Sequence, residues 1–232
     1  MQREIRIYEE LIKKGNEIYF LTYGNSNDRK WEPYLNGIKV IPVYERLKKS
    51  ENKIYSLIQT LLIPWIFKNE FKNVDILKTN QIMGSWVAVL VKLFFNKSLI
   101  IRCGYDLYEF SKKNNSKYLI KMFSYLVSYI GFKLSTRIHV ATYEDSLNIQ
   151  NIFKIPKAKI FVFPNWIDTK IFYTFIEDKP SKILFVGRLT YQKNITLLIK
   201  ALENTQYELD IVGEGDKLED LKNEALSRNV KI

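Results

Sequence analysis

The chain has 232 residues, which is enough for one large domain or two modest domains with separate cores. Apolar residues make up 47% of it and charged residues 26%, so the composition excludes a disordered chain and is typical of a globular protein. The net charge of +11 is unevenly distributed: residues 1–165 hold 26 Lys and Arg against 14 Asp and Glu, whereas residues 166–232 hold 10 against 11.

The remaining bulk features favour a cytoplasmic protein. The charged stretch 1–10 does not resemble a signal peptide, and a single cysteine, Cys103, excludes an internal disulfide. The most apolar stretches, 82–95 and 118–132, are too short or too interrupted by lysine to cross a bilayer. They are predicted to be core helices, and an interfacial membrane role stays open for either.

An anionic partner would explain the basic first part of the chain. A membrane surface, an acidic acceptor and nucleic acid all fit the charge, but no nucleic-acid recognition motif is present, so we expect no nucleic acid. We expect reversible docking on an anionic inner membrane face. The alternative is a lysine-rich composition without any functional meaning.

Strand-like and helix-like segments alternate along the whole chain. Such alternation predicts βαβ units with a mainly parallel sheet. The predicted strands are 18–23, 38–43, 74–79, 99–102, 137–141, 160–163, 183–186 and 208–212. The predicted helices are 3–14, 53–69, 82–95, 116–134, 143–152, 194–203 and 216–228.

Pro164 and Asn165, followed by an irregular charged stretch, mark the expected domain boundary. We therefore predict a first domain over 1–165, a linker over 166–180 and a second domain over 181–232. The second would have only two or three strands, the last starting near residue 230, and is expected to be incomplete. A strand is also expected before the first helix, so the first domain would lack its first strand.

The segment 183–194 carries the strongest functional signal. A run of strand-forming residues stops at Gly187, and Arg188 and Lys193 follow before a helical pattern begins. Ligands of open α/β sheets bind beyond the carboxyl ends of strands, where helix N-termini favour anions. A cation beside a helix N-terminus needs compensation, and a phosphate or diphosphate would supply it. The competing interpretation is a solvated loop with two ordinary surface cations.

Three ordered motifs resemble the group 1 family of nucleotide-sugar glycosyltransferases. They are KIFVFPNWIDTKIF at 159–172, ILFVGRLTYQKN at 183–194 and LDIVGEGDKLEDL at 209–221. Residues 8–24 also resemble the first helix and second strand of that family's amino-terminal domain. The resemblance implies an α/β, GT-B-like fold with two Rossmann-like parallel-sheet domains, the first binding acceptor and the second binding donor.

The resemblance implies a role for each matching residue. Arg188 and Lys193 match the pair that binds the donor diphosphate and stabilises charge on the leaving group, which makes them the catalytic candidates. Gly187 would let the backbone approach the phosphate. Residues 213–215 (Gly213, Glu214 and Gly215) match the turn beside the nucleoside, although an ordinary tight turn explains them equally well. Asn165 and Asp168 match the interdomain segment, where capping explains them without chemistry.

Several departures from the family pattern matter. The acidic E-x7-E motif and the glycine-rich loop after the first strand are not among these residues, so we expect the chain alone to be inactive or nearly so. Trp166 replaces the usual glycine of the linker motif. Arg102 and Asp106 stand near the position where many members have a histidine. They are candidates for the acceptor cleft, or alternatively a local ion pair.

The resemblance implies a retaining transfer from a nucleoside-diphosphate sugar to a carbohydrate or lipid-linked acceptor, as in polysaccharide or glycolipid biosynthesis. It implies no metal and no cofactor other than the donor, and no zinc-type cluster is visible. His139, the only histidine, is predicted to be structural. Two alternatives stay open: a non-catalytic remnant that keeps a phosphate pocket, and a GT-B epimerase, against which the single histidine argues.

Overall fold

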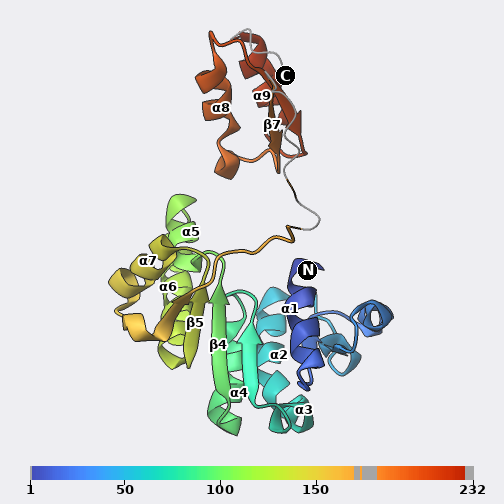
Figure 1. The fold of residues 1–232 in the computed structure, drawn as a ribbon. Helices are drawn as coiled ribbons and strands as arrows, with labels where there is room; N and C mark the ends of the chain where they lie inside the picture. Colours follow the sequence, from blue (N-terminus) through green and yellow to red (C-terminus); the bar gives the residue numbers. More distant parts are fainter. Residues whose placement is uncertain (1, 170–172, 174–181, 228–232) are drawn as a thin grey trace. The chain divides into compact units, whose positions relative to one another are not determined.

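The computed structural model describes residues 2–169, 173 and 182–227 (Figure 1). The chain divides into two compact units, an amino-terminal unit, Met1–Asp168, and a carboxyl-terminal unit, Thr169–Ile232. Residues 166–168 of the predicted linker fall in the amino-terminal unit, and most of the remainder of that linker lies outside the described residues.

The strands of the amino-terminal unit are all parallel. β1 (Tyr19–Thr22) pairs with β2 (Lys39–Pro42), and a separate four-stranded sheet has the order β3-β4-β5-β6. Its members are β3 (Ile76–Thr79), β4 (Ser98–Cys103), β5 (Arg137–Val140) and β6 (Ile160–Val162). The expectation of a mainly parallel sheet built from βαβ units is therefore confirmed.

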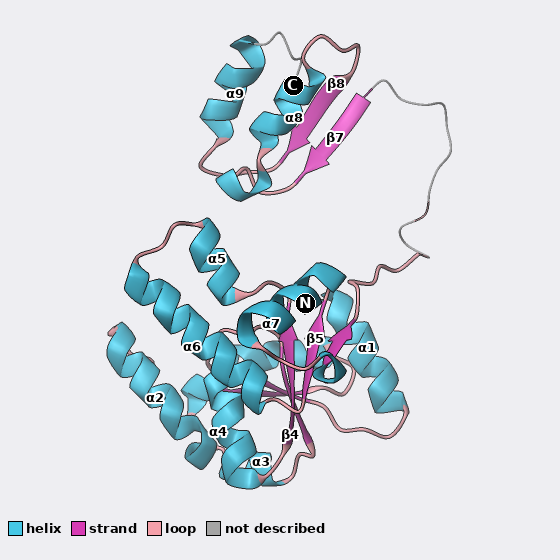
Figure 2. Cartoon of the chain, turned by 90° about the vertical axis from the view of Figure 1, so that its left-hand side faces the viewer, coloured by secondary structure: helices cyan, strands magenta, loops and turns pink. Residues whose placement is uncertain are grey.

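Helices cover this sheet on both faces, but unequally. Figure 2 shows α2, α4 and α6 on one side of the strands and α1 on the other. The helices of the unit are α1 (Gln2–Lys13), α2 (Lys53–Ile66), α3 (Lys68–Lys72), α4 (Ser85–Phe95), α5 (Leu107–Lys113), α6 (Tyr118–Leu134) and α7 (Tyr143–Phe153). Short 3-10 segments are Ser26–Tyr34, Val43–Glu45 and Lys157–Lys159.

The main core lies between β4, β5 and the helices. Along β4 every second side chain is buried, namely Leu99, Ile101 and Cys103, because successive residues of a strand point to opposite faces. Phe132 from α6 and Phe153 from α7 are fully buried against this row, with ring centroids 5.2 Å apart. The other face of β4, which includes Arg102, is only half-buried.

The predicted helices differ from the observed ones in three places. The predicted helix 53–69 is two helices, α2 and α3, separated at Phe67, whose backbone leaves helical geometry while its side chain is buried. Helix α5 was not predicted, because its seven residues are too few to show a helical repeat of apolar side chains. The predicted helix 82–95 starts only at Ser85, since Gly84 adopts φ +80°.

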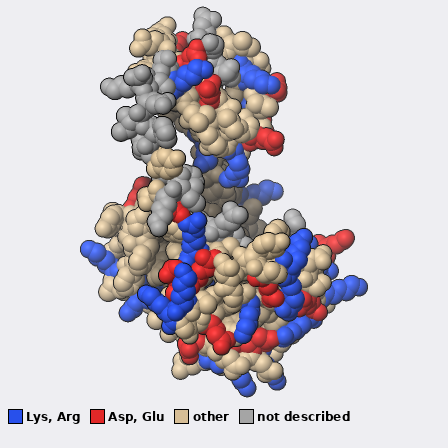
Figure 3. Space-filling model, turned by 45° about the vertical axis from the view of Figure 1, so that its right-hand side comes forward, with Lys and Arg blue, Asp and Glu red and all other residues tan. Residues whose placement is uncertain are grey.

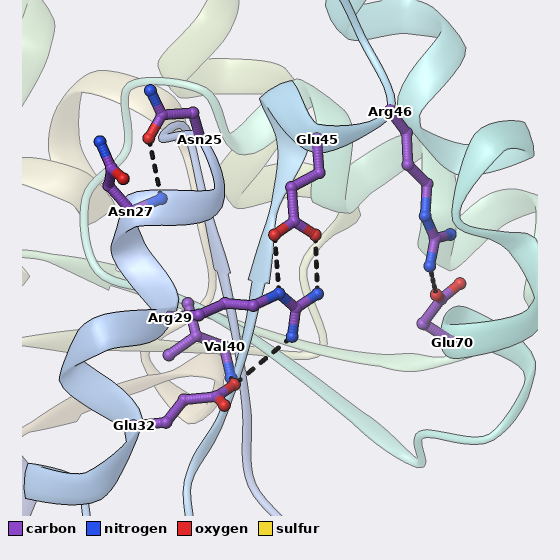
Figure 4. A network of polar contacts seen from close by, with 8 residues as sticks. All are labelled: Asn25, Asn27, Arg29, Glu32, Val40, Glu45, Arg46 and Glu70. Carbon is purple, nitrogen blue, oxygen red and sulfur yellow. Dashed lines mark hydrogen bonds and ion pairs between the residues drawn. The ribbon is translucent and has the colours of Figure 1, made fainter.

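Ion pairs fasten the 3-10 segment Ser26–Tyr34 to the edge of the small sheet (Figure 4). Arg29 donates to both carboxylate oxygens of Glu45, each at 2.7 Å, and its Nη1 lies 3.6 Å from Glu32. Glu32 in turn accepts a 2.7 Å hydrogen bond from the backbone N–H of Val40 in β2. This network satisfies a backbone donor of an edge strand and fixes the long connection between β1 and β2.

The carboxyl-terminal unit is a parallel strand pair with two helices. β7 (Lys182–Val186) pairs in register with β8 (Glu208–Val212), and the helices are α8 (Ile195–Leu202) and α9 (Leu218–Ser227). A 3-10 turn, Tyr191–Lys193, precedes α8. The buried residues of its core are Leu189, Ile195, Ile199, Leu202, Leu209, Leu221 and Ala225. The strand predicted near residue 230 lies outside the described residues.

Candidate functional site

The loop between β7 and α8 holds the two candidate cations. β7 ends at Val186, and the chain passes through Gly187 and Arg188 before Leu189 turns inward. Leu189 is 1% exposed and packs with Ile195 and other core residues of the unit. This buried leucine, next to the exposed Arg188, anchors the loop, so the segment that carries Arg188 is held at the carboxyl end of the parallel strand pair. In parallel α/β sheets this end is where ligands bind.

The loop that follows β8 packs backbone against backbone on this segment. The Leu189 N–H donates to the Glu214 carbonyl at 2.8 Å, and the Lys217 N–H donates to the Leu189 carbonyl at 3.0 Å. Two positions earlier, the Gly187 N–H donates to the Val212 carbonyl at 3.0 Å. These bonds extend the pairing of β7 and β8 beyond the strands and bring residues 187–189 beside residues 212–217.

Gly213 and Gly215 are required by this close approach. A Cβ atom on Gly213 would lie 1.8 Å from the Gly187 carbonyl oxygen, and one on Gly215 would lie 2.2 Å from the Leu189 carbonyl oxygen. Neither glycine has a positive φ, so the reason is steric and not conformational. The structure therefore gives both glycines a packing role. Their predicted role beside a nucleoside stays a prediction, as does that of the exposed Glu214.

Arg188 and Lys193 are both exposed. Among the residues that the structure describes, neither side chain forms a hydrogen bond or an ion pair. Lys193 ends the 3-10 turn, and Asn194, with φ 47°, separates it from the first turn of α8. Both cations therefore remain available to an anion, and their convergence on a single diphosphate stays a prediction.

The N-terminus of α8 is more suited to an anion than that of α9. The first turn of α8 contains no acidic residue, and Asn194 makes no side-chain cap hydrogen bond there. The first turn of α9 already contains Glu219 and Asp220, which complement the positive end of the helix dipole. An external anion near the two loops is therefore expected to favour the α8 end.

Asp106 has a structural role in the amino-terminal unit. Its side chain is buried and caps α5, with Oδ1 accepting the Glu109 N–H at 2.8 Å. Burial raises the pKa of this carboxyl, and the hydrogen bonds that it accepts oppose that effect. The alternative of an Arg102–Asp106 ion pair is wrong, since no salt bridge joins these two described residues. The predicted place of both in an acceptor cleft is untested.

Arg102 and Asp168 connect the start of the predicted linker to the amino-terminal unit. Arg102 donates to Asn165 Oδ1 at 3.0 Å, and Asp168 forms an ion pair with Arg6 of α1. The sequence motif predicts only a capping role for Asn165 and Asp168 and does not reveal these partners. No local signal could have found them, because each pair joins positions more than 60 residues apart in the chain.

His139 and Cys103 have the surroundings of structural residues. His139 lies 4.7 Å from the Phe163 ring, and burial, followed by the charges of Lys78 and Arg102, lowers the pKa of its imidazole. Cys103 is buried, and burial raises the pKa of its thiol well above the usual range, which disfavours the nucleophilic thiolate. Within the described parts of the chain, no group of His, Cys, Asp or Glu could hold a metal ion.

Comparison with known families places the two loops in context. Residues 167–232, which include both loops, match the family model for glycosyl transferases group 1. The match covers this part of the chain alone. A search of curated proteins finds no match to the chain.

Solved structures show the same fold at low sequence identity. The apo form of the lipopolysaccharide outer core galactosyltransferase WaaB is 19% identical, with a TM-score of 0.63 over 93% of this chain. HepE from Anabaena, in complex with UDP and glucose, is 11% identical, with a TM-score of 0.67 over 99%. MurG from Acinetobacter baumannii is 11% identical, with a TM-score of 0.54 over 99%. The expected α/β, GT-B-like fold is confirmed.

The chain is shorter than the chains of these solved structures. It spans 56% of the WaaB chain, 62% of the HepE chain and 59% of the MurG chain. The activity, substrates and partners of the whole protein are therefore taken up as proposals.

Proposed function

We propose that this protein is a glycosyltransferase that transfers a sugar from a nucleoside-diphosphate sugar to a carbohydrate or lipid-linked acceptor, with retention of the anomeric configuration. The observation that carries the proposal is the exposure of Arg188 and Lys193 at the carboxyl end of β7, without partners among the described residues, in the part of the chain that matches the group 1 family model. The HepE structure, solved with UDP and glucose, supports a nucleoside-diphosphate sugar as donor.

The chemistry assigns a role to each cation. When the bond between sugar and diphosphate breaks, negative charge develops on the departing phosphate oxygen, and cations already aimed at that oxygen lower the barrier. The planar guanidinium of Arg188 would hold two phosphate oxygens at once, and the flexible ammonium of Lys193 would follow the developing charge. Gly187, beside Arg188, leaves room for the phosphate near the backbone.

Calorimetric titration of the 232-residue protein with UDP and GDP tests the donor site. A hydrogen bond to a charged group contributes about 1.5–3 kcal/mol, so Arg188→Ala and Lys193→Ala should each weaken binding of the preferred nucleotide by about 10- to 150-fold. Lys200→Ala, which removes an exposed cation of α8 away from the loop, is the matched control and should leave the affinity unchanged. Equal affinities for all four proteins would refute the site.

The other features of the proposal have separate tests. Retention is checked by the anomeric configuration of the product in an NMR-monitored transfer reaction. Residues 1–232 alone are expected to show little or no turnover, since the acidic family motif is not among them. The basic amino-terminal part, with 26 Lys and Arg against 14 Asp and Glu over residues 1–165, supports a position on the cytoplasmic face of a membrane.

A further inference from the structure

Three neighbouring helices of the amino-terminal unit contain no acidic residue. Helices α2, α4 and α6 are rich in apolar side chains, and every charged residue in them is a lysine. These lysines are Lys53, Lys92, Lys121 and Lys133. The exclusion of Asp and Glu from three consecutive long helices is not shared by α1, α7 or α9, each of which contains acidic residues.

The three helices lie side by side on one face of the sheet (Figure 2). Trp86 of α4 donates a 2.9 Å hydrogen bond to Thr60 of α2. On the other side of α4, Gly131 of α6 lies so close to Ser85 that a Cβ atom there would be 3.0 Å from the Ser85 hydroxyl. Helix α4 is thus held between α2 and α6, and the outer surfaces of the three helices form one side of the unit, the α2/α4/α6 face.

Large apolar side chains point outward along α6. They recur at helical spacing, which places them on one stripe opposite the buried Phe132, and their exposed fractions run from 43% to 70%. The members of this stripe are Leu119, Met122, Phe123, Leu126 and Ile130. A surface helix of a globular protein normally keeps one side polar, so this stripe is an apolar surface that the core of the unit does not use.

A second exposed apolar group lies at the ends of α2 and α4. Trp65 and Phe94 are each 53% exposed, with ring centroids 4.4 Å apart, and Leu62 and Leu93 are about equally exposed beside them in the sequence. Tryptophan and tyrosine are the side chains most enriched at the level of lipid headgroups, because their rings are apolar with one polar edge. Tyr118, at the start of α6, is 78% exposed.

The charge pattern selects the kind of partner. A protein partner would be compatible with mixed charges around an apolar patch, whereas an anionic lipid surface repels carboxylates and attracts lysines. On the α2/α4/α6 face, exposed apolar side chains therefore occur without any carboxylate from these helices. Of their lysines, Lys133 is exposed, whereas Lys92 is half-buried and donates to Thr136 Oγ1 at 2.9 Å. The side of the unit shown in Figure 3 differs, since acidic and basic side chains are interspersed there. No helix among the described residues is long and apolar enough to span a bilayer.

We propose that the α2/α4/α6 face is a docking surface for a bilayer that contains anionic phospholipid, on which the exposed apolar side chains enter the headgroup region while Lys133 contacts lipid phosphates. The proposal deepens the proposed function, because it names the surface that would bring the enzyme to a lipid-linked acceptor. The use of such docking rests on the proposed function, but the docking itself does not, because it requires no sugar donor.

Vesicle flotation of the 232-residue protein tests the proposal. We expect binding to vesicles of phosphatidylcholine with phosphatidylglycerol, much weaker binding to phosphatidylcholine alone, and release at high salt, where charges are screened. Replacing exposed apolar side chains that become buried in lipid should weaken partitioning about tenfold or more, so we predict that loss for the double variant Tyr118→Ser/Leu119→Gln. Lys133→Gln should weaken binding to anionic vesicles about fivefold.

A matched control distinguishes binding through this face from non-specific lipid binding through any exposed apolar side chain. Tyr34 and Leu226 are 74% and 76% exposed, close to the values of Tyr118 and Leu119, and lie on other elements. Tyr34→Ser/Leu226→Gln should therefore bind vesicles like the wild type. Binding that is independent of anionic lipid, or an equal loss in both double variants, would overturn the proposal. The proposal would also be overturned if the wild type bound no vesicles and sedimented as a dimer, while Tyr118→Ser/Leu119→Gln sedimented as a monomer.

The same variants separate this proposal from the donor site. Tyr118→Ser/Leu119→Gln should bind UDP or GDP like the wild type, because the changes lie in the amino-terminal unit. A protein that binds nucleotide but not vesicles would contradict the docking surface alone. A protein that binds vesicles through this face but no nucleotide would contradict the proposed function alone.

Discussion

The substitution Gly213→Ala tests whether the two loops of the donor site depend on backbone contact. The new Cβ would lie 1.8 Å from the Gly187 carbonyl oxygen, whereas ordinary contacts start near 3.4 Å, so the two segments must separate by about 1.6 Å. Hydrogen bonds of 3.0 and 2.8 Å flank the contact, from Gly187 to Val212 and from Leu189 to Glu214. Both would be lost at that separation, and at about 1 kcal/mol each the free energy of unfolding of this unit falls by about 2 kcal/mol.

Thermal unfolding and hydrogen exchange of the 232-residue protein measure this loss. For a domain of this size, about 2 kcal/mol lowers the melting temperature by roughly 8–16 °C, and the amide of Leu189 should exchange faster. Gly187→Ala is the control, because its Cβ meets the Phe185 ring at 3.2 Å and a ring can turn away. Its cost should stay below about 1 kcal/mol. If Gly213→Ala melts like the wild type and Leu189 keeps its protection, the steric argument is wrong.

Three further predictions concern single residues of the amino-terminal unit. Asp106→Asn should keep the cap of α5, and its free energy of unfolding in urea at neutral pH should equal or exceed that of the wild type, because burial penalises the charged carboxyl. Asp106→Ala should lower the free energy of unfolding by about 1 kcal/mol. The reverse order of the two variants would contradict the capping role. Because folding lowers the pKa of His139, the unfolded chain binds a proton at this residue more readily than the folded chain does. The free energy of unfolding of the wild type should therefore fall as the pH drops below about 6.5. In urea denaturation measured at several pH values, His139→Phe should show a weaker dependence of that free energy on pH. Cys103 should react with a thiol reagent only on unfolding; rapid labelling of the native protein would show that the thiol is accessible.

Much of the fold could be predicted from the sequence because its signals are local. The eight strands predicted between residues 18 and 212 correspond to the eight strands in the described part of the chain, since a strand is a short run of β-branched and aromatic residues bounded by turn residues. Helix α6 was equally visible, because 17 residues give several turns of a periodic pattern. Helix α5 was missed since two turns carry too few repeats, and the division of α2 from α3 depends on the burial of Phe67 against distant residues.

The candidate site could be predicted only in part, for the same reason. The sequence placed Gly187, Arg188 and Lys193 after a strand and before a helix, and this order needs no knowledge of distant contacts. It did not show that Gly213 and Gly215 are needed because another backbone segment, more than 20 residues away, passes within contact distance. It also did not show that Asp106 caps α5, and the predicted place of Asp106 in an acceptor cleft stays a prediction.

The sequence by itself determined the alternation of strands and helices, the parallel sheets and the position of two cations beyond β7. These features follow from backbone preferences and side-chain periodicity, which act within a few residues. Only the tertiary structure decided which glycines are fixed by close packing, which charged groups pair, and which apolar side chains of α2, α4 and α6 remain exposed. These properties depend on residues that folding brings together from distant parts of the chain, and local preferences contain no information on that proximity.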